Sequence, residues 1–216
     1  MRKLLSLCAV MLVVWALPAS AFTPISSPDA AYLAATTYID PSAIPNLTNV
    51  SSITDGVLTV SFSTAMNKRT APGGGWATWS VAPDSQRGPG DTLPVFYSEE
   101  ALTVTFTLSQ PVSIFGFEAE PDPFGVHAMT AQFYDAAGNL LGTISRNVDG
   151  NAGARLFAAQ SSTPIISSVV FSSNVDWAAG AFRYALPTGG PVIPEPTTMA
   201  LFGAGLLGFL PLRRRR

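Results

Sequence analysis

The chain has 216 residues, of which 47% are apolar and only 12% are charged. Its formal charge of −2 argues against a nucleic-acid-binding protein, because such proteins carry a basic patch. The single cysteine excludes a disulfide framework and a zinc site built from cysteines, and the single histidine excludes a metal site with two histidines.

The N-terminus has the three parts of a secretory signal peptide, and we expect this peptide to cover residues 1–21. A basic start precedes an apolar run over residues 4–17, and the run is followed by the small residues Ala-Ser-Ala. Cleavage between Ala21 and Phe22 removes the only cysteine from the exported protein. The alternative is an uncleaved membrane anchor, but the apolar run is short for a span of about 20 residues.

The residues that follow predict a short helix and then a series of strands. Residues 22–56 are expected to form an N-terminal extension with one helix, which has Asp29 near its start. From residue 57 onward, apolar residues alternate with serines and threonines, most clearly over residues 102–108, as in half-buried strands. Further runs of this kind lie at 57–63, 112–119, 128–134, 140–145, 155–159, 165–172 and 182–186.

Eight short strands separated by turn residues are typical of one all-β domain. We therefore predict a single β-sandwich of jelly-roll type over residues 57–188, followed by a linker over residues 189–193.

Candidate ligand-binding residues lie in a long irregular stretch over residues 65–98. Trp76, Trp79 and Tyr97 carry aromatic rings that suit the apolar faces of sugars, and loops on rigid β scaffolds often carry binding residues. The two tryptophans are three residues apart, so in a strand they would face opposite sides, with one buried and the other exposed. The alternative is that both tryptophans cover the end of the sandwich.

Three carboxylates follow the strand predicted over residues 112–119. Alternation places Glu118 and Glu120 on one face, and Asp122 lies just beyond them. We expect that these three side chains could converge and hold a structural calcium ion, because calcium prefers several such oxygens. The alternative is that the flanking prolines end the strand and the acids face water.

A carbohydrate-active hydrolase would need two carboxylates at a set separation across a sugar. Glu99 and Glu100 cannot form that pair with each other, because adjacent residues of a strand point to opposite faces. His127 has no cysteine partner in the exported chain, and the sequence holds no Gly-x-Ser-x-Gly motif. We therefore expect no catalytic residues and a protein that is not an enzyme.

The C-terminal segment begins with Pro194-Glu195-Pro196 and continues with a mostly apolar stretch over residues 197–212. As a helix this stretch would rise about 24 Å, which is less than the hydrocarbon core of about 30 Å. The chain ends in four arginines that should stay on the cytoplasmic side, namely Arg213, Arg214, Arg215 and Arg216.

This arrangement over residues 192–216 resembles the PEP-CTERM sorting signal of Gram-negative bacteria. The resemblance implies processing by an exosortase near the PEP motif, transient insertion into the inner membrane, and an association with exopolysaccharide and biofilm. The central domain resembles the galactose-binding-like and jelly-roll modules that often precede such signals. That likeness rests on Phe115-Gly116-Phe117-Glu118, Phe133-Tyr134-Asp135 and Phe182-Arg183-Tyr184.

Residues 22–193 carry six basic and thirteen acidic residues, a net charge of −7 that the whole-chain value conceals. An acidic domain suits cations and neutral glycans better than phosphate backbones. The sequence thus predicts an exported surface or matrix protein that associates with extracellular polysaccharide, with no cofactor other than a structural calcium. A structural or adhesive protein that acts through protein contacts, and less so a carbohydrate-active hydrolase, are the alternatives.

Overall fold

The computed structural model describes residues 22–162 and 166–187. The predicted signal peptide with Ala21, the linker over residues 189–193 and the sorting signal over residues 194–216 lie outside the described residues. Within the described ranges the one helix is α1 (Ala30–Ala35), and no helix there is long and apolar enough to cross a membrane.

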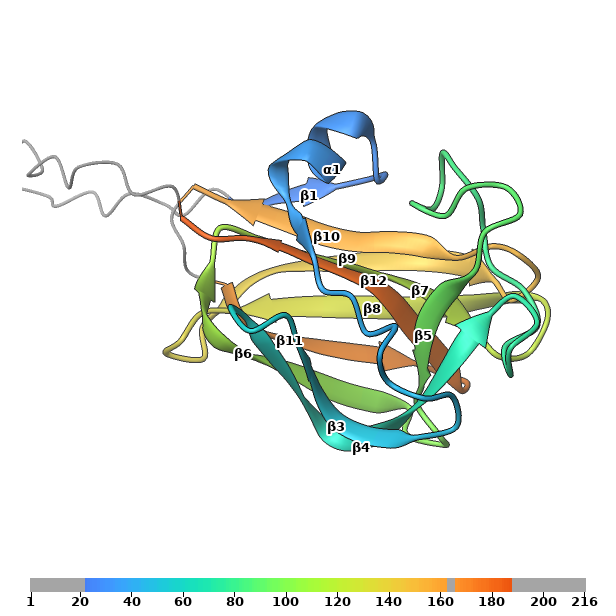
Figure 1. The fold of residues 1–216 in the computed structure, drawn as a ribbon. Coiled ribbons are helices and arrows are strands. Elements are labelled where there is room, and N and C mark those ends of the chain that lie inside the picture. The colour runs from blue at the N-terminus through green and yellow to red at the C-terminus, as the bar shows by residue number, and fades with distance from the viewer. Residues whose placement is uncertain (1–21, 163–165, 188–216) are drawn as a thin grey trace, which may run out of the picture. The chain divides into compact units, whose positions relative to one another are not determined.

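The described domain is almost entirely antiparallel β-structure (Figure 1). Its strands are β1 (Phe22–Ile25), β2 (Thr37–Tyr38), β3 (Asn49–Thr54), β4 (Thr59–Ala71), β5 (Leu93–Tyr97), β6 (Thr103–Val112), β7 (Ile114–Pro121), β8 (Val126–Tyr134), β9 (Leu140–Asp149), β10 (Arg155–Ser161), β11 (Ile166–Ser173) and β12 (Trp177–Ala185).

The strands from β5 to β12 have the order of a jelly roll. Four of them pair as β5–β12–β7–β10 in one layer, and the other four pair as β6–β11–β8–β9. Strand β4 belongs to both layers, because residues 60–62 pair with β6 and residues 67–71 pair with β5. The prediction of an all-β sandwich is therefore confirmed.

All eight predicted strands are present with shifted ends, and the predicted helix is α1, with the Asp29 carboxylate accepting from the Tyr32 backbone N–H. Residues 22–56, predicted as an extension with one helix, also contribute β1, β2 and β3 to the sheet. These strands were missed since β1 and β2 have only four and two residues, and β3 is mostly polar. Strand β5 was missed inside the stretch predicted as irregular.

The core between the two layers is rich in aromatic side chains that are fully or almost fully buried. They include Phe62, Phe96, Phe106, Phe115, Phe117, Phe133, Phe157, Phe171, Trp177 and Phe182. Because each fully buried ring contributes on the order of 2 kcal/mol, this core stabilises the fold without disulfides.

Strand β7 is buried on both faces. Phe115, Phe117 and Ala119 point into the core, so Glu118 and Glu120 point outward from the layer. The outer face would be wet in an open sandwich. Here it is covered by α1, whose Tyr32 packs on the layer, and by the loop over residues 72–92.

Candidate functional site

The loop over residues 72–92 packs through Trp76 and Trp79 onto the outer face of the β5–β12–β7–β10 layer. The two side chains retain only 5% and 2% of their exposure and contact Leu93 and Val95 of β5. The expectation of one buried and one exposed tryptophan is therefore wrong, and both cover the sandwich. The reason is that the segment is a loop lying flat on a sheet, so the alternation of a strand does not apply to it.

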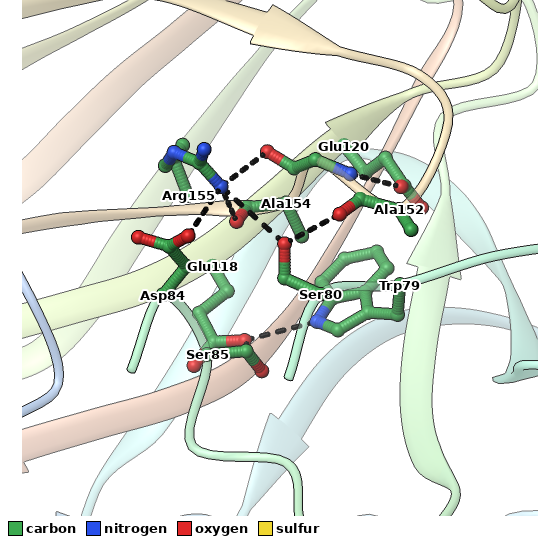
Figure 2. A network of polar contacts seen from close by, with 10 residues as sticks. Trp79, Ser80, Asp84, Ser85, Glu118, Glu120, Ala152, Ala154 and Arg155 are labelled. Carbon is green, nitrogen blue, oxygen red and sulfur yellow. Dashed lines mark hydrogen bonds and ion pairs between the residues drawn. The ribbon is translucent and has the colours of Figure 1, made fainter. Parts of the chain in front are cut away.

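Glu118 fixes the middle of this loop (Figure 2). One carboxylate oxygen, Oε2, accepts from the Trp79 indole N–H at 2.9 Å and from the Ser85 hydroxyl. The other oxygen, Oε1, accepts from the Gln86 backbone N–H at 2.6 Å. Both oxygens are thus occupied by donors from one loop.

Glu120 fixes the start of the same loop. Its Oε2 accepts from the Trp76 indole N–H at 2.7 Å. Its Oε1 accepts from the Thr78 hydroxyl and from the Gly153 backbone N–H, each at 3.1 Å. We call Glu118 and Glu120, with the loop donors that they hold, the glutamate clamp.

Both glutamate side chains of the glutamate clamp are buried. Burial raises the pKa of both carboxyl groups above the usual range for glutamic acid, and their hydrogen bonds oppose that shift. Arg155 adds an outer contact, because its Nη1 lies 3.4 Å from Asp84 Oδ2 and donates to the Gly153 carbonyl (Figure 2). The clamp is thus a closed polar network in which each carboxylate oxygen has a partner.

The expected convergence of Glu118, Glu120 and Asp122 is not found. In residues 22–162 and 166–187 no group of three acidic, histidine or cysteine side chains is placed to hold a metal ion. Asp122 is exposed, and its backbone N–H donates to the Asp176 carbonyl beyond the end of the clamp. Calcium binding stays a prediction, without a ligand group in this part of the chain.

The other candidates have mainly structural contacts. Tyr97 is half-buried, with its ring against Trp76 and its hydroxyl donating to Asp176 at 3.2 Å. Glu99 and Glu100 lie in the turn after β5 with φ angles of +48° and +71°, so they are not in a strand as the sequence argument assumed.

His127 lies in β8 and is half-exposed. Its Nε2 is buried and has no hydrogen-bond partner among the described residues.

A polar pocket of about 420 Å³ lies beside the clamped loop, and we call it the Lys68 pocket. Its lining residues come from four segments: β2 with the chain that follows it, strand β4, the clamped loop and strand β5. They are Tyr38, Asp40, Ser42, Lys68, Thr70, Gln86, Thr92, Leu93 and Pro94. The volume lies within the range of about 300–1,000 Å³ that is usual for small-ligand sites.

Lys68 is 5% exposed, which is rare for a lysine without a carboxylate partner. Its Nζ donates to Asn46 Oδ1 at 2.6 Å and to Thr70 Oγ1 at 3.4 Å. Among the described residues the one ion pair is that of Arg155 with Asp84, so neutral oxygens alone surround the Lys68 ammonium at hydrogen-bond distance. Burial lowers the pKa of Lys68 from its usual value.

The glutamate clamp also positions one wall of the Lys68 pocket. The backbone N–H of Gln86 is held by Glu118, while its side-chain oxygen accepts from Arg183 Nη1 at 3.0 Å. Arg183 also lies 5.9 Å from the centre of the Tyr38 ring, and its other partners are backbone and hydroxyl oxygens of the α1 end. A second cation therefore stands behind the pocket, with no carboxylate of the described residues at hydrogen-bond distance, although its charge also acts on the Glu118 carboxyl group.

Sequence reasoning missed the Lys68 pocket, because residues 65–71 were taken as irregular. In the structure Met66 and Lys68 both belong to β4 and are both buried. The signal available in the sequence was a lysine two residues after a methionine. It can be used only once residues 59–71 have been recognised as a strand.

The fold and the tail together define a class of protein: an exported all-β domain followed by a C-terminal sorting signal. Residues 192–216 match the model of the PEP-CTERM protein-sorting motif. The chain is therefore an exosortase substrate that is exported to the cell surface or the extracellular space of a Gram-negative bacterium.

No curated protein matches the sequence. Among solved structures, the chain resembles the enzymatically active domain of bacteriophage CBA120 tailspike protein 4 at 17% identity and a TM-score of 0.31, over 61% of this chain and 20% of that one. It also resembles an arabinose-bound α-L-arabinofuranosidase at 13% identity and a TM-score of 0.32, over 76% of this chain and 25% of the enzyme. The chain thus spans a quarter or less of these structures, and similarities at such TM-scores carry no argument about function.

Proposed function

We propose that this protein is a non-enzymatic component of the cell surface or matrix that associates with extracellular polysaccharide. The Lys68 pocket is the observation that carries the proposal. It offers hydroxyl and amide groups beside a tyrosine ring and two apolar side chains on a rigid sandwich. This combination of polar groups and apolar surface suits a sugar ring, which has hydroxyls at its edge and apolar faces.

The state of the glutamates supports a binding protein over a hydrolase. A glycosidase needs a carboxylic acid and a second carboxylate that both reach the sugar. Glu118 and Glu120 are 1% and 0% exposed, and their oxygens are occupied by loop donors. These two carboxylates are therefore unsuited to contact a substrate.

Affinity electrophoresis of the full chain tests the proposal. We expect its migration to be slowed in gels that contain polysaccharide, relative to gels without it, across a panel of dextran, xanthan and polygalacturonate. Unchanged migration in every gel would refute the polysaccharide association. Release of reducing sugar from any of these polymers would refute the non-enzymatic part and favour the hydrolase.

A further inference from the structure

We propose that the Lys68 pocket binds an acidic sugar residue of a polysaccharide, with the Lys68 ammonium paired to the sugar carboxylate. This inference rests on the proposed association with polysaccharide and adds the class of sugar that the pocket selects. The proposed attraction for an anion is confined to the pocket, because the domain as a whole carries a net negative charge.

The Lys68 ammonium has no carboxylate of the described residues at hydrogen-bond distance. An ammonium group has three N–H donors, and Asn46 and Thr70 accept from Lys68 at its two hydrogen bonds. A buried charge without a counter-charge costs free energy, so a bound carboxylate would offset a cost that the free protein carries. Arg183 lies behind Gln86 and Tyr38, where its charge also acts on the Glu118 carboxyl group.

The lining also limits the charge of the anion. Asp40 lines the same pocket, and its Oδ1 accepts from the Ser42 backbone N–H at 2.9 Å. Its negative charge opposes any anion beside Lys68, and it opposes a doubly charged phosphate group more strongly than a singly charged carboxylate. A carboxylate is therefore the anion that we assign to this pocket.

The rest of the lining offers partners for hydroxyl groups of a ligand. Ser42, Thr70 and Thr92 line the pocket, and the hydroxyls of Ser42 and Thr70, which donate to Asp40 and Asn46, can still accept. The side-chain oxygen of Gln86 accepts from Arg183, which leaves its amide NH₂ group as a donor for a ligand. Pro94 and the ring of Tyr38 supply apolar contact surface. Hydroxyl-rich carboxylates, that is uronic acid residues, match this set better than a simple organic acid.

The experiment is affinity electrophoresis of the full chain in polygalacturonate and in the same polymer after full methyl esterification, at 0.15 M salt. Esterification removes the charge of each sugar and keeps its backbone. The salt limits general repulsion between the acidic domain and the polymer, because the screening length is then about 8 Å. We expect about tenfold tighter retention by the acidic polymer, as one charge-assisted contact would give.

Three variants locate the effect. Lys68→Met should abolish the preference for the acidic polymer. Arg69→Met removes the same charge from the next residue of β4, which does not line the pocket, and should preserve the preference. Asp40→Asn removes an exposed acid from the pocket and should strengthen retention by the acidic polymer about threefold. This gain of affinity tests the inference even if Lys68→Met folds poorly.

Equal retention by both polymers, or a preference that survives in Lys68→Met, would overturn the inference and leave the proposed function standing. Failure of dextran, xanthan and both forms of polygalacturonate to slow the wild-type chain would refute the proposed function itself, and this inference with it.

Discussion

Glu118 on β7 and Lys68 on β4 are both buried ionisable side chains, but their surroundings differ. The Glu118 carboxylate accepts three hydrogen bonds from one loop, and no part of it lines the Lys68 pocket. The Lys68 ammonium has two neutral acceptors and lines a polar pocket of about 420 Å³. Both oxygens of the Glu118 carboxylate have partners within the protein, whereas the Lys68 ammonium has one N–H donor left for a ligand.

Burial of a charged group therefore does not by itself mark a binding site. What matters is whether the protein supplies all the partners that the group needs. On that criterion the glutamate clamp stabilises the fold and positions Gln86, and the Lys68 pocket is the place for a ligand.

The largest expected effect is that of Glu118→Ala on stability. The change leaves the buried donors of Trp79, Ser85 and Gln86 without their acceptor, and we expect it to lower the free energy of unfolding by about 3 kcal/mol. Urea denaturation measures the loss. Asp122→Ala, which removes an exposed acid from the same segment, is the control and should stay within about 0.5 kcal/mol of the wild type. Similar values for the two variants would contradict the clamp.

A smaller effect is expected for the hydrogen bond between Trp79 and Glu118. We expect a double-mutant cycle of Trp79→Phe with Glu118→Ala to give a coupling free energy of about 1.5 kcal/mol, because each single change removes the hydrogen bond and the cycle cancels the separate changes in side-chain volume. Denaturation of the four proteins supplies the value. Trp79→Phe alone should leave retention by polygalacturonate unchanged, and weaker retention would restore the aromatic binding surface predicted from the sequence.

A pH-dependent effect should also mark the clamp. Because burial raises the pKa of Glu118, the folded state keeps a proton that the unfolded state has already lost above the ordinary value of 4.5. The stability that Glu118 contributes is thus fully present below pH 4.5 and is lost as the pH rises through the folded-state pKa. We expect the stability advantage of the wild type over Glu118→Gln to shrink as the pH rises from 4.5 to 8.

Urea denaturation of both proteins across that range measures the trend, with Asp122→Asn as the matched loss of an exposed carboxylate. An advantage that grows with pH would mean that the hydrogen bonds outweigh burial and that the carboxylate is favoured in its charged form.

The smallest effect is expected for Lys68→Met. Thr70 still donates to Asn46 at 2.8 Å after this change, so we expect the free energy of unfolding to fall by less than about 1 kcal/mol. Thermal or urea denaturation checks the value. A loss as large as that of Glu118→Ala would make Lys68 a structural residue and remove the contrast between the two regions.

Alternation predicted the sandwich because the strands from β6 to β12 have one face in an aromatic core and enough length to show a period of two. Strands β1 and β2 are too short for such a signal. In β4 the alternation of buried and exposed residues breaks where the strand leaves one layer for the other.

The candidate site was predicted only in part. Alternation correctly placed Glu118 and Glu120 on one face, but it could not reveal that a loop about 40 residues earlier supplies their donors. Tryptophans were expected to bind sugars, whereas here their indole N–H groups bind the glutamates. The Lys68 pocket is formed by four segments that are separated in the sequence, so no local sequence pattern predicts it.

The most direct measurement uses the chain's small number of lysines and tryptophans. Lys3 and Lys68 are its two lysines, and the indole N–H groups of Trp76 and Trp79 report on the clamp. In the full chain labelled with ¹⁵N at both residue types, an oligogalacturonate should be added while the side-chain NMR signals are followed. The Lys68 ammonium signal should shift and the two indole signals should stay in place. Shifted indole signals with an unchanged Lys68 signal would contradict the account in which the glutamate clamp is structural and the Lys68 pocket binds the ligand.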